Sequence, residues 1–367
     1  MRLRWLSFRN RLLSSPHFQR WAASFPLTRF VARHRARALF DLSAGFVYSQ
    51  VLAAGIEVGL YQKLEAGPLS LTELAEALGL PLAGARRLAE ASAALQLLQR
   101  IGADHYLLGI HGAALLGNPA VSQMVEHHRL FYRDLSDPVA LLSGTHGPTS
   151  LAQFWSYATR DRVAPPNGVE VGPYSALMDG SQSLIAEDIL EAYSFGRHQC
   201  LLDVGGGEGS FISSVAAAHP TLRVMLFDLP AVAARAEAAL ASRALLGRAR
   251  AVGGDVFRDP LPAGADLISL VRVLHDHDDP QALAILRAAR AALPPGGVLV
   301  VAEPLAQTRG AEAIGAYFEL YLLAMGQGRP RTVDELSALL REAGFVRPRS
   351  LPTRRPMLTG LLIAHVE

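Results

Sequence analysis

Apolar positions in the second half of the chain form short continuous runs, separated by stretches in which apolar residues recur every three or four positions. The runs occupy residues 201–204, 222–227, 249–252, 267–274 and 298–303. Short apolar runs that alternate with helical stretches are typical of buried parallel strands. The pattern therefore predicts an α/β fold with a mostly parallel sheet for residues 196–367.

The chain before this region has helical spacing. A capping box at Ser70 and Glu73 begins an apolar stripe that stops at Gly79. Further helices flank this one, and a short hairpin follows, which is the order of a winged helix. We therefore expect an N-terminal all-helical winged-helix domain over 41–116, with helices over 41–59 and 81–98 and the hairpin around 103–107.

A winged helix can bind DNA by placing its second helix in the major groove. Here that helix offers only Arg86 and Arg87 before an apolar run over 88–98, which suits packing. We therefore expect no nucleic-acid partner. A mostly helical linker over 117–195 should join this domain to the α/β domain.

Residues 1–40 form a basic, aromatic arm. The arm contains nine arginines and no acidic residue, and aromatic pairs such as Trp5 with Phe8 or Trp21 with Phe25 share a helical face. Such a pattern is typical of an amphipathic contact with an anionic membrane surface. Packing of these side chains on the protein or on a dimer partner explains the pattern equally well, and an organellar transit peptide is a third alternative.

Composition adds three limits. Cys200 is the single cysteine, so an intrachain disulfide is excluded and an intracellular location is favoured. No apolar stretch approaches the roughly 18 residues that cross a bilayer, so we expect no transmembrane helix. The 367 residues suffice for two domains.

The first strand of the α/β region runs into a glycine-rich turn, Asp203-Val204-Gly205-Gly206-Gly207-Glu208-Gly209. Glycine permits a ligand to approach the backbone closely, and the helix expected after the turn points its free N–H groups at the ligand. A nucleotide-like cofactor is the natural occupant. The dinucleotide fingerprint would need its third small residue at 210, where this chain has Ser, so the turn alone does not identify the cofactor.

Two acidic residues follow in register with the turn. Asp228, followed by Leu229, ends the second strand, and Asp255, followed by Val256, ends the third. An acid after the second strand can accept both ribose hydroxyls of a nucleotide, and we expect the second acid to accept from an adenine amino group. A helix cap at Asp228 and a turn at Asp255 are the alternative interpretations.

These motifs together resemble those of the S-adenosylmethionine-dependent methyltransferases. The segments at 273–279 and 293–303 narrow the resemblance to the small-molecule O-methyltransferases, the family of the plant caffeate enzymes and of acetylserotonin methyltransferase. The resemblance implies a Rossmann-like domain with a seven-stranded sheet, a winged-helix domain that forms a homodimer, and S-adenosyl-L-methionine as cofactor. It implies a cofactor site formed by Asp203, Gly205, Gly207, Asp228, Leu229, Asp255, Val256 and Arg272.

The same resemblance implies that His275 is the general base and that Glu303 orients its imidazole. A neutral imidazole has an ordinary pKa of about 6.5, so it can take a proton from an acceptor hydroxyl at physiological pH. The fourth strand, expected over 267–274, places His275 at the carboxyl edge of the sheet, where α/β proteins bind ligands. This is where a base is expected.

Two positions depart from the family pattern. The second orienting glutamate of the family should precede the Arg331-Thr332 pair, where this chain has Pro330. Arg272 fills a basic position before the base only with a shift of one residue, since Val271 aligns with the plant pattern. These departures leave the family intact and weaken the case for the plant enzymes' substrates.

Residues 275–279 also bring histidines and carboxylates together, as a metal site would. Asp279-Pro280, however, reads as an N-cap followed by proline at the first helical position, which explains one of the acids without a metal. We therefore expect no metal.

Residues for the acceptor pocket are expected on two helices. Tyr174 and Met178 are four residues apart and match positions that line the pocket in the family, with packing in the core as the alternative. The segment 311–328 should form the other wall, with Phe318, Tyr321, Leu322 and Met325 on adjacent faces. The pocket is therefore expected to be largely apolar.

The arm and the linker carry the most specific resemblance, through segments 9–13, 37–42, 46–50 and 132–138. They are similar to the carotenoid O-methyltransferases of purple photosynthetic bacteria. This implies methyl transfer to the 1-hydroxyl of an acyclic hydroxycarotenoid by a cytoplasmic enzyme that is peripheral on the inner, photosynthetic membrane. An aromatic, polyketide or bacteriochlorophyll-precursor acceptor is the alternative, and outside enzymes the alternative is a cofactor-sensing winged-helix regulator.

Overall fold

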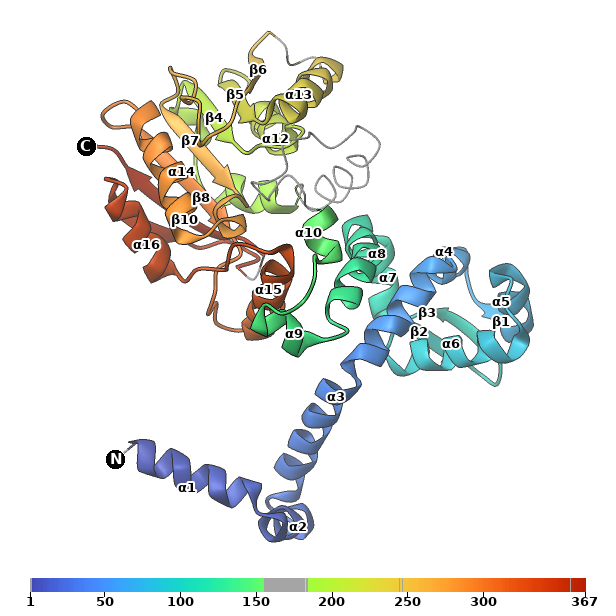
Figure 1. Ribbon diagram of the computed structural model, residues 1–367. Coiled ribbons are helices and arrows are strands. Elements are labelled where there is room, and N and C mark those ends of the chain that lie inside the picture. The colour runs from blue at the N-terminus through green and yellow to red at the C-terminus, as the bar shows by residue number, and fades with distance from the viewer. Residues whose placement is uncertain (1, 155–181, 183, 244, 246, 357) are drawn as a thin grey trace. The chain divides into compact units, whose positions relative to one another are not determined.

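The computed structural model describes residues 2–154, 182, 184–243, 245, 247–356 and 358–367 (Figure 1). The chain divides into two compact units, Met1–Glu126 and His127–Glu367. The division falls inside helix α8 (Pro119–Asp134), so the linker predicted over 117–195 is shared between the two units.

The larger unit contains the predicted sheet, and it has seven strands. Their order is β6-β5-β4-β7-β8-β10-β9, with β10 antiparallel to both of its neighbours and the other pairs parallel. The expected Rossmann-like architecture is therefore present. The strands are β4 (Cys200–Val204), β5 (Arg223–Asp228), β6 (Ala249–Gly253), β7 (Leu267–Val271), β8 (Val298–Glu303), β9 (Val346–Leu351) and β10 (Gly360–His365).

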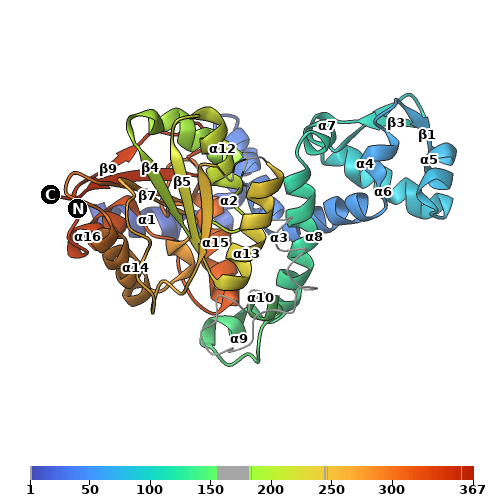
Figure 2. The ribbon, with the colours of Figure 1, turned by 90° about the horizontal axis from the view of Figure 1, so that it is seen from above.

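Helices cover both faces of this sheet, because the strands carry apolar side chains on both sides. One face packs on α14 (Asp279–Ala292) and α16 (Val333–Glu342), which lie together in Figure 2. The other face packs on α12 (Ser210–Ala218), α13 (Pro230–Ser242) and the helical residues 184–192. The result is a three-layer α/β sandwich.

The remaining described elements of this unit are short, apart from α15 (Glu312–Met325). Helices α9 (Pro138–Ser143) and α10 (Ser150–Phe154) precede the sheet. Two 3₁₀ helices, η1 (Phe195–Arg197) and η2 (Leu274–Asp276), complete the unit.

The fourth strand is shorter than predicted. β7 ends at Val271, and Arg272 has a φ of 58°, a left-handed conformation that a non-glycine residue rarely adopts and that ends the strand. The apolar run continues to Leu274 because the Leu274 side chain, the first in η2, is buried in the core. His275 therefore lies in a 3₁₀ turn beyond the strand.

The smaller unit has the predicted winged-helix order, with the capping box at Ser70 and Glu73 formed as expected. It is not wholly helical, because β1 and β2 both pair with β3 in a small antiparallel sheet. Its elements after the arm are α4 (Leu60–Lys63), β1 (Leu69–Ser70), α5 (Leu71–Leu78), α6 (Leu82–Ala94), β2 (Leu98–Ile101), β3 (His105–Leu108) and α7 (Ile110–Leu116).

The arm is helical, with α1 (Arg2–Ser14) and α2 (Pro16–Ser24) separated at Ser15, because Pro16 is tolerated in the first turn of a helix but not in its interior. The third helix, α3 (Arg29–Glu57), continues without a break through the predicted domain boundary after residue 40. By length and composition α3 could cross a bilayer, with a mean hydropathy of 1.4 over its best 18 residues, which the sequence analysis did not anticipate. The core helix of a soluble protein or a signal sequence can have the same length and composition, so this finding alone assigns no membrane span.

Candidate active site

The glycine turn between β4 and α12 has a conformation that side chains would oppose. Gly205 has a φ of +72°, and a Cβ there would lie 2.8 Å from Cγ2 of Val273. A Cβ on Gly206 would lie 2.5 Å from Oδ2 of Asp203. The turn therefore keeps its backbone bare beside Asp203, and a ligand can approach it closely.

Asp203 presents an unused acceptor at this turn. The residue is 1% exposed, and its Oδ1 accepts a hydrogen bond from the Ser269 hydroxyl at 2.6 Å. Its Oδ2 has no hydrogen-bond partner among the described residues. Burial raises the pKa of Asp203 to about 7, with a contribution from the charge of Asp228 against the lowering effect of Ser269. A buried carboxylate in this state favours a ligand that brings a donor or a positive charge.

Asp228 ends β5, as predicted, and its carboxylate lies against the same turn. Oδ2 accepts the Gly207 N–H at 2.9 Å, and Oδ1 accepts the Leu229 N–H at 2.7 Å. Burial raises the pKa of Asp228 to about 6, although these two N–H donors lower it. The alternative role as a cap of α13 is wrong, because the N-cap position is Leu229 and no side-chain cap bond is formed.

Asp255 follows β6 and makes a local turn. Its Oδ1 accepts the Phe257 N–H at 2.9 Å, and its Oδ2 lies 3.3 Å from the Arg258 guanidinium. Val256 is partly buried and packs against the core cluster that includes α14 and α16. These contacts agree with the turn role, and they leave the carboxylate partly exposed and able to accept a further donor.

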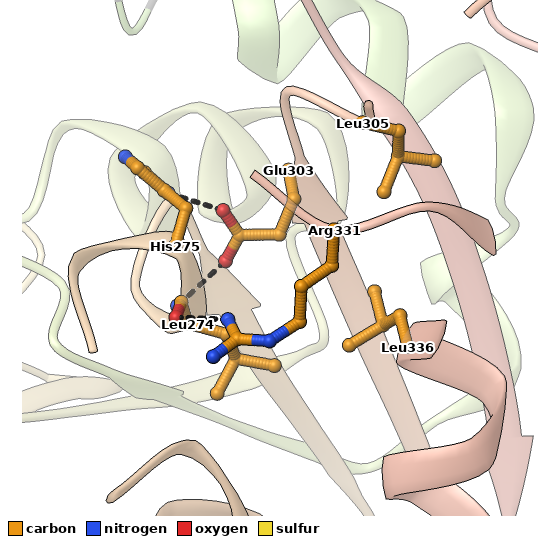
Figure 3. Close-up of a pocket in the computed structure, with 6 residues that line it drawn as sticks. All are labelled: Leu274, His275, Glu303, Leu305, Arg331 and Leu336. Atoms are coloured by element: carbon orange, nitrogen blue, oxygen red, sulfur yellow. Dashed lines mark hydrogen bonds and ion pairs between the residues drawn. The ribbon is translucent and has the colours of Figure 1, made fainter. Parts of the chain in front are cut away.

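His275 and Glu303 form the buried centre of the site (Figure 3). Glu303 ends β8, and its Oε2 hydrogen-bonds Nδ1 of His275. Its Oε1 accepts the backbone N–H groups of Val273 and Leu274 at 2.9 and 2.7 Å. One carboxylate therefore fixes both the imidazole and the backbone that carries it.

The other imidazole nitrogen of His275 faces a second carboxylate. Oδ1 of Asp276 lies 3.2 Å from Nε2. Burial lowers the pKa of His275, but Asp276 and Glu303 outweigh that effect, so that the pKa is raised above its usual value even though Arg272 opposes the change. The charge of Asp276 was missed in the sequence analysis, although it lies beside the predicted base.

Arg331 holds the turn that carries His275. The residue is 3% exposed, and its guanidinium donates to the carbonyl oxygen of Leu274 at 2.6 Å (Figure 3). It also donates to the carbonyl oxygen of His277 at 2.6 Å. Its Nε donates to Asp279 at 2.9 Å. Leu274, His275, Glu303 and Arg331, with Leu305 and Leu336, line a small pocket. In the sequence, Arg331 is only a marker for the position of the missing glutamate.

Asp279 does not cap α14. It is the first residue of the helix, the N-cap is Asp278, and the Asp279 carboxylate instead binds Arg329 and Arg331. Oδ1 of Asp278 accepts the Gly328 N–H at 3.0 Å. Among the described residues, no group of three or more His, Cys, Asp or Glu side chains is placed to hold a metal ion.

Of the predicted pocket residues, Tyr174 and Met178 lie outside the described residues. Tyr321 is 7% exposed, and its hydroxyl lies 2.8 Å from Nε2 of His127 on α8. Burial lowers the pKa of His127 to about 4, so its neutral ring can accept from that hydroxyl. Met325 is buried. Tyr321 and Met325 are therefore both buried side chains of α15.

Phe318 is the residue of this expected wall whose ring contacts the base. The Phe318 ring packs edge-on against His275, with centroids 6.3 Å apart. Tyr317 stacks on Tyr321 and bonds His128 at 2.9 Å. The wall beside His275 is thus aromatic and is tied to α8 through two histidine–tyrosine hydrogen bonds.

The site therefore combines a bare backbone turn, buried acceptors and an imidazole flanked by carboxylates. Asp203 and Asp228, with their raised pKa values, suit a ligand that is cationic and rich in donors. S-adenosyl-L-methionine offers an ammonium group, a sulfonium centre and ribose hydroxyls, so the residues present fit it. The imidazole can exchange a proton with an acceptor next to that ligand.

Comparison with known families and relatives agrees with this chemistry. Residues 132–346 match a family described as O-methyltransferase domain, and residues 40–116 match an O-methyltransferase dimerisation domain. A demethylspheroidene O-methyltransferase of Cereibacter sphaeroides is 41% identical over 355 residues, which cover 96% of this chain and 93% of the relative. The enzyme of the same name from Rhodobacter capsulatus is 37% identical and covers 98% of this chain and 90% of the relative.

Among solved structures, the S-adenosylmethionine-dependent methyltransferase SibL in its apo form superposes with a TM-score of 0.75. It is 28% identical, and the match covers 90% of this chain and 98% of that one. The similarity thus extends over both units of the chain.

Proposed function

The chain belongs to the S-adenosylmethionine-dependent O-methyltransferases, and from this premise we propose that it methylates the 1-hydroxyl of an acyclic hydroxycarotenoid. The observation that carries the proposal is the 41% identity to a demethylspheroidene O-methyltransferase over 96% of the chain. The Rhodobacter capsulatus relative of the same name supports it over 98% of the chain.

Asp203, Gly205, Gly207, Asp228, Leu229, Asp255, Val256 and Arg272 would hold S-adenosyl-L-methionine, which supplies an electrophilic methyl group on sulfur. The open Oδ2 of Asp203 and the bare turn at Gly205 support this assignment. Asp228 also supports this assignment, because its carboxylate can accept hydrogen bonds from ribose hydroxyls. A proton must still leave the acceptor.

We propose that His275 removes this proton from the acceptor hydroxyl. Glu303 holds Nδ1, so Nε2 is the nitrogen that can act on an acceptor hydroxyl. A tertiary alcohol is a weak acid, so His275 would take its proton while the new C–O bond forms and not before. Tyr321 and Met325, with Tyr174 and Met178, are proposed to shape the apolar acceptor pocket, and Phe318 adds an aromatic ring beside the base.

Labelled S-adenosyl-L-methionine with either a 1-hydroxycarotenoid or a panel of phenols tests the acceptor. We expect label on the carotenoid, and His275→Ala should abolish transfer while cofactor affinity stays near that of the unmodified protein. Label on phenols alone would replace the carotenoid with an aromatic or polyketide acceptor. Cofactor binding without transfer to any acceptor, bacteriochlorophyll precursors included, would favour a cofactor-sensing regulator.

The arm is proposed to attach the enzyme to an anionic membrane surface, where a carotenoid alcohol dissolves. Trp5 is 61% exposed and Trp21 is 50% exposed, and nine arginines accompany them without an acidic residue up to position 40. Aromatic side chains at the lipid boundary with arginines on headgroups would bind such a surface.

A homodimer is supported by the dimerisation-domain match over residues 40–116. The exposed apolar side chains Phe40, Leu42 and Phe46 on α3 fall within this match. They would be covered by a second copy of the chain, since a large apolar surface seldom stays in water.

A further inference from the structure

The base of this chain has two carboxylate neighbours, although the position of the family's second orienting glutamate holds Pro330. Glu303 binds Nδ1 of His275, and Asp276 lies 3.2 Å from Nε2. The second carboxylate therefore comes from the residue directly after the base, and not from the segment before Arg331.

The turn that carries both residues is fixed from two sides. Glu303 accepts the N–H groups of Val273 and Leu274, and Arg331 donates to the carbonyl oxygens of Leu274 and His277. The backbone on either side of Asp276 is thereby held by two buried, charged side chains. A side chain on so rigid a turn keeps its direction toward the imidazole.

We propose that Asp276 is the positioning carboxylate of the base: it accepts the Nε2–H of His275 and so stabilises and holds in place the imidazolium that forms when the acceptor hydroxyl loses its proton. This role rests on the proposed function for the identity of the reaction. During transfer the acceptor oxygen forms the C–O bond, the C–S bond breaks with its electron pair going to sulfur, and the hydroxyl proton passes to Nε2. The imidazolium then has a donor on each nitrogen, and a carboxylate accepts each one.

The charged groups around His275 determine the direction in which its pKa is shifted. Two carboxylates, Glu303 and Asp276, favour the charged imidazole, while burial and the guanidinium of Arg272 disfavour it. The hydroxyl of Tyr317, which lies near Arg272, has a pKa raised by burial and stays neutral. Removing the charge of Asp276 must therefore lower the pKa of His275 and also weaken the stabilisation of the imidazolium.

Asp276→Asn is the decisive variant, because it keeps an acceptor of the same shape and removes the charge. We expect the acidic limb of the kcat–pH profile to move to lower pH by about one unit, the scale of a charge within 4–6 Å. The plateau of kcat should fall at least about tenfold, as when an outer-shell partner is lost. Cofactor affinity should stay unchanged. Asp334→Asn, at an exposed position of α16, removes the same charge and should change neither quantity.

A titration of the His275 imidazole by NMR in the full-length protein tests the role of Asp276 independently of which acceptor is methylated. In Asp276→Asn the pKa of His275 should fall whatever acceptor the enzyme uses. An unmodified enzyme that is inactive on carotenoids would overturn the proposed acceptor and leave this titration valid. An unchanged His275 titration, or a loss of kcat without movement of the acidic limb, would overturn the role of Asp276.

Discussion

Asp203 shows at the scale of a residue how burial prepares a site for a cation. Its Oδ1 is used by Ser269, and its Oδ2 has no partner among the described residues. A carboxylate left in that state binds protons more readily than one in water, which is why its pKa rises to about 7. A cationic ligand competes for the same oxygen.

The affinity for S-adenosyl-L-methionine should therefore fall as the pH is lowered from 8 to 6. Below its raised pKa, Asp203 becomes protonated and loses its attraction for a positive charge, by up to about tenfold in affinity per pH unit. Asp203→Asn keeps an acceptor for Ser269 and removes the charge, so it should bind the cofactor more weakly and with a flatter pH dependence. Calorimetry at several pH values measures both. A constant affinity between pH 6 and 8 in the unmodified protein would count against this role.

At the scale of an element, the β4–α12 turn is defined by what its glycines exclude. Gly205 faces Val273, which directly precedes the η2 turn that carries His275. The turn proposed to bind the cofactor therefore lies against the segment that carries the proposed base, through Gly205 and Val273. A substitution in the turn should affect both cofactor binding and the position of the base.

Gly205→Ala should weaken cofactor binding and disturb the base together. The new Cβ would lie 2.8 Å from Val273, and the left-handed conformation adds strain of about 1–2 kcal/mol. Gly296→Ala is the matched control, because Gly296 has a similar φ of +78° but no atom within 4 Å of the new Cβ. Both variants should lose thermal stability, and only Gly205→Ala should lose cofactor affinity. Equal affinity in the two variants would show that the contact with Val273 is unimportant.

At the scale of the whole molecule, the arm is distinguished by large apolar side chains that are exposed. In α1 and α2 only Ala22 is buried among the described side chains, while the Trp21 ring stacks on Phe25 and lies tilted against Phe18. Guanidinium groups lie over two arm rings, Arg9 over Trp5 and Arg29 over Phe30. The arm thus has internal order and little burial.

Deletion of residues 1–39, which keeps the dimerisation match at 40–116, should abolish flotation of the protein with anionic liposomes. Each arginine near such a surface contributes about 1 kcal/mol, so binding of the full chain should also weaken with salt. The double variant Trp5→Ser and Trp21→Ser should weaken flotation and leave the salt dependence in place. Loss of the dimer on deletion, with flotation retained, would make the arm a contact between copies.

Local sequence patterns determined much of this protein. Short continuous apolar runs predicted the strands, and apolar residues spaced three or four apart predicted the helices, since burial leaves a direct record in apolar spacing. Short motifs located the glycine turn, Asp228, His275 and Glu303 at the carboxyl edge of the sheet. Two details failed for local reasons: the apolar run to Leu274 concealed the end of β7, and Asp279 has the appearance of a cap but pairs with Arg329 and Arg331.

Only the tertiary structure decided which of these groups meet. Ser269 reaches Asp203 because β7 pairs with β4 in the register that sets those two residues side by side. Arg331 reaches the carbonyl of Leu274 across 57 positions of sequence. Such contacts depend on strand register and on the packing of α16, which no local spacing encodes. The predicted base was therefore visible in the sequence, while the charges that set its pKa became clear only in the folded chain.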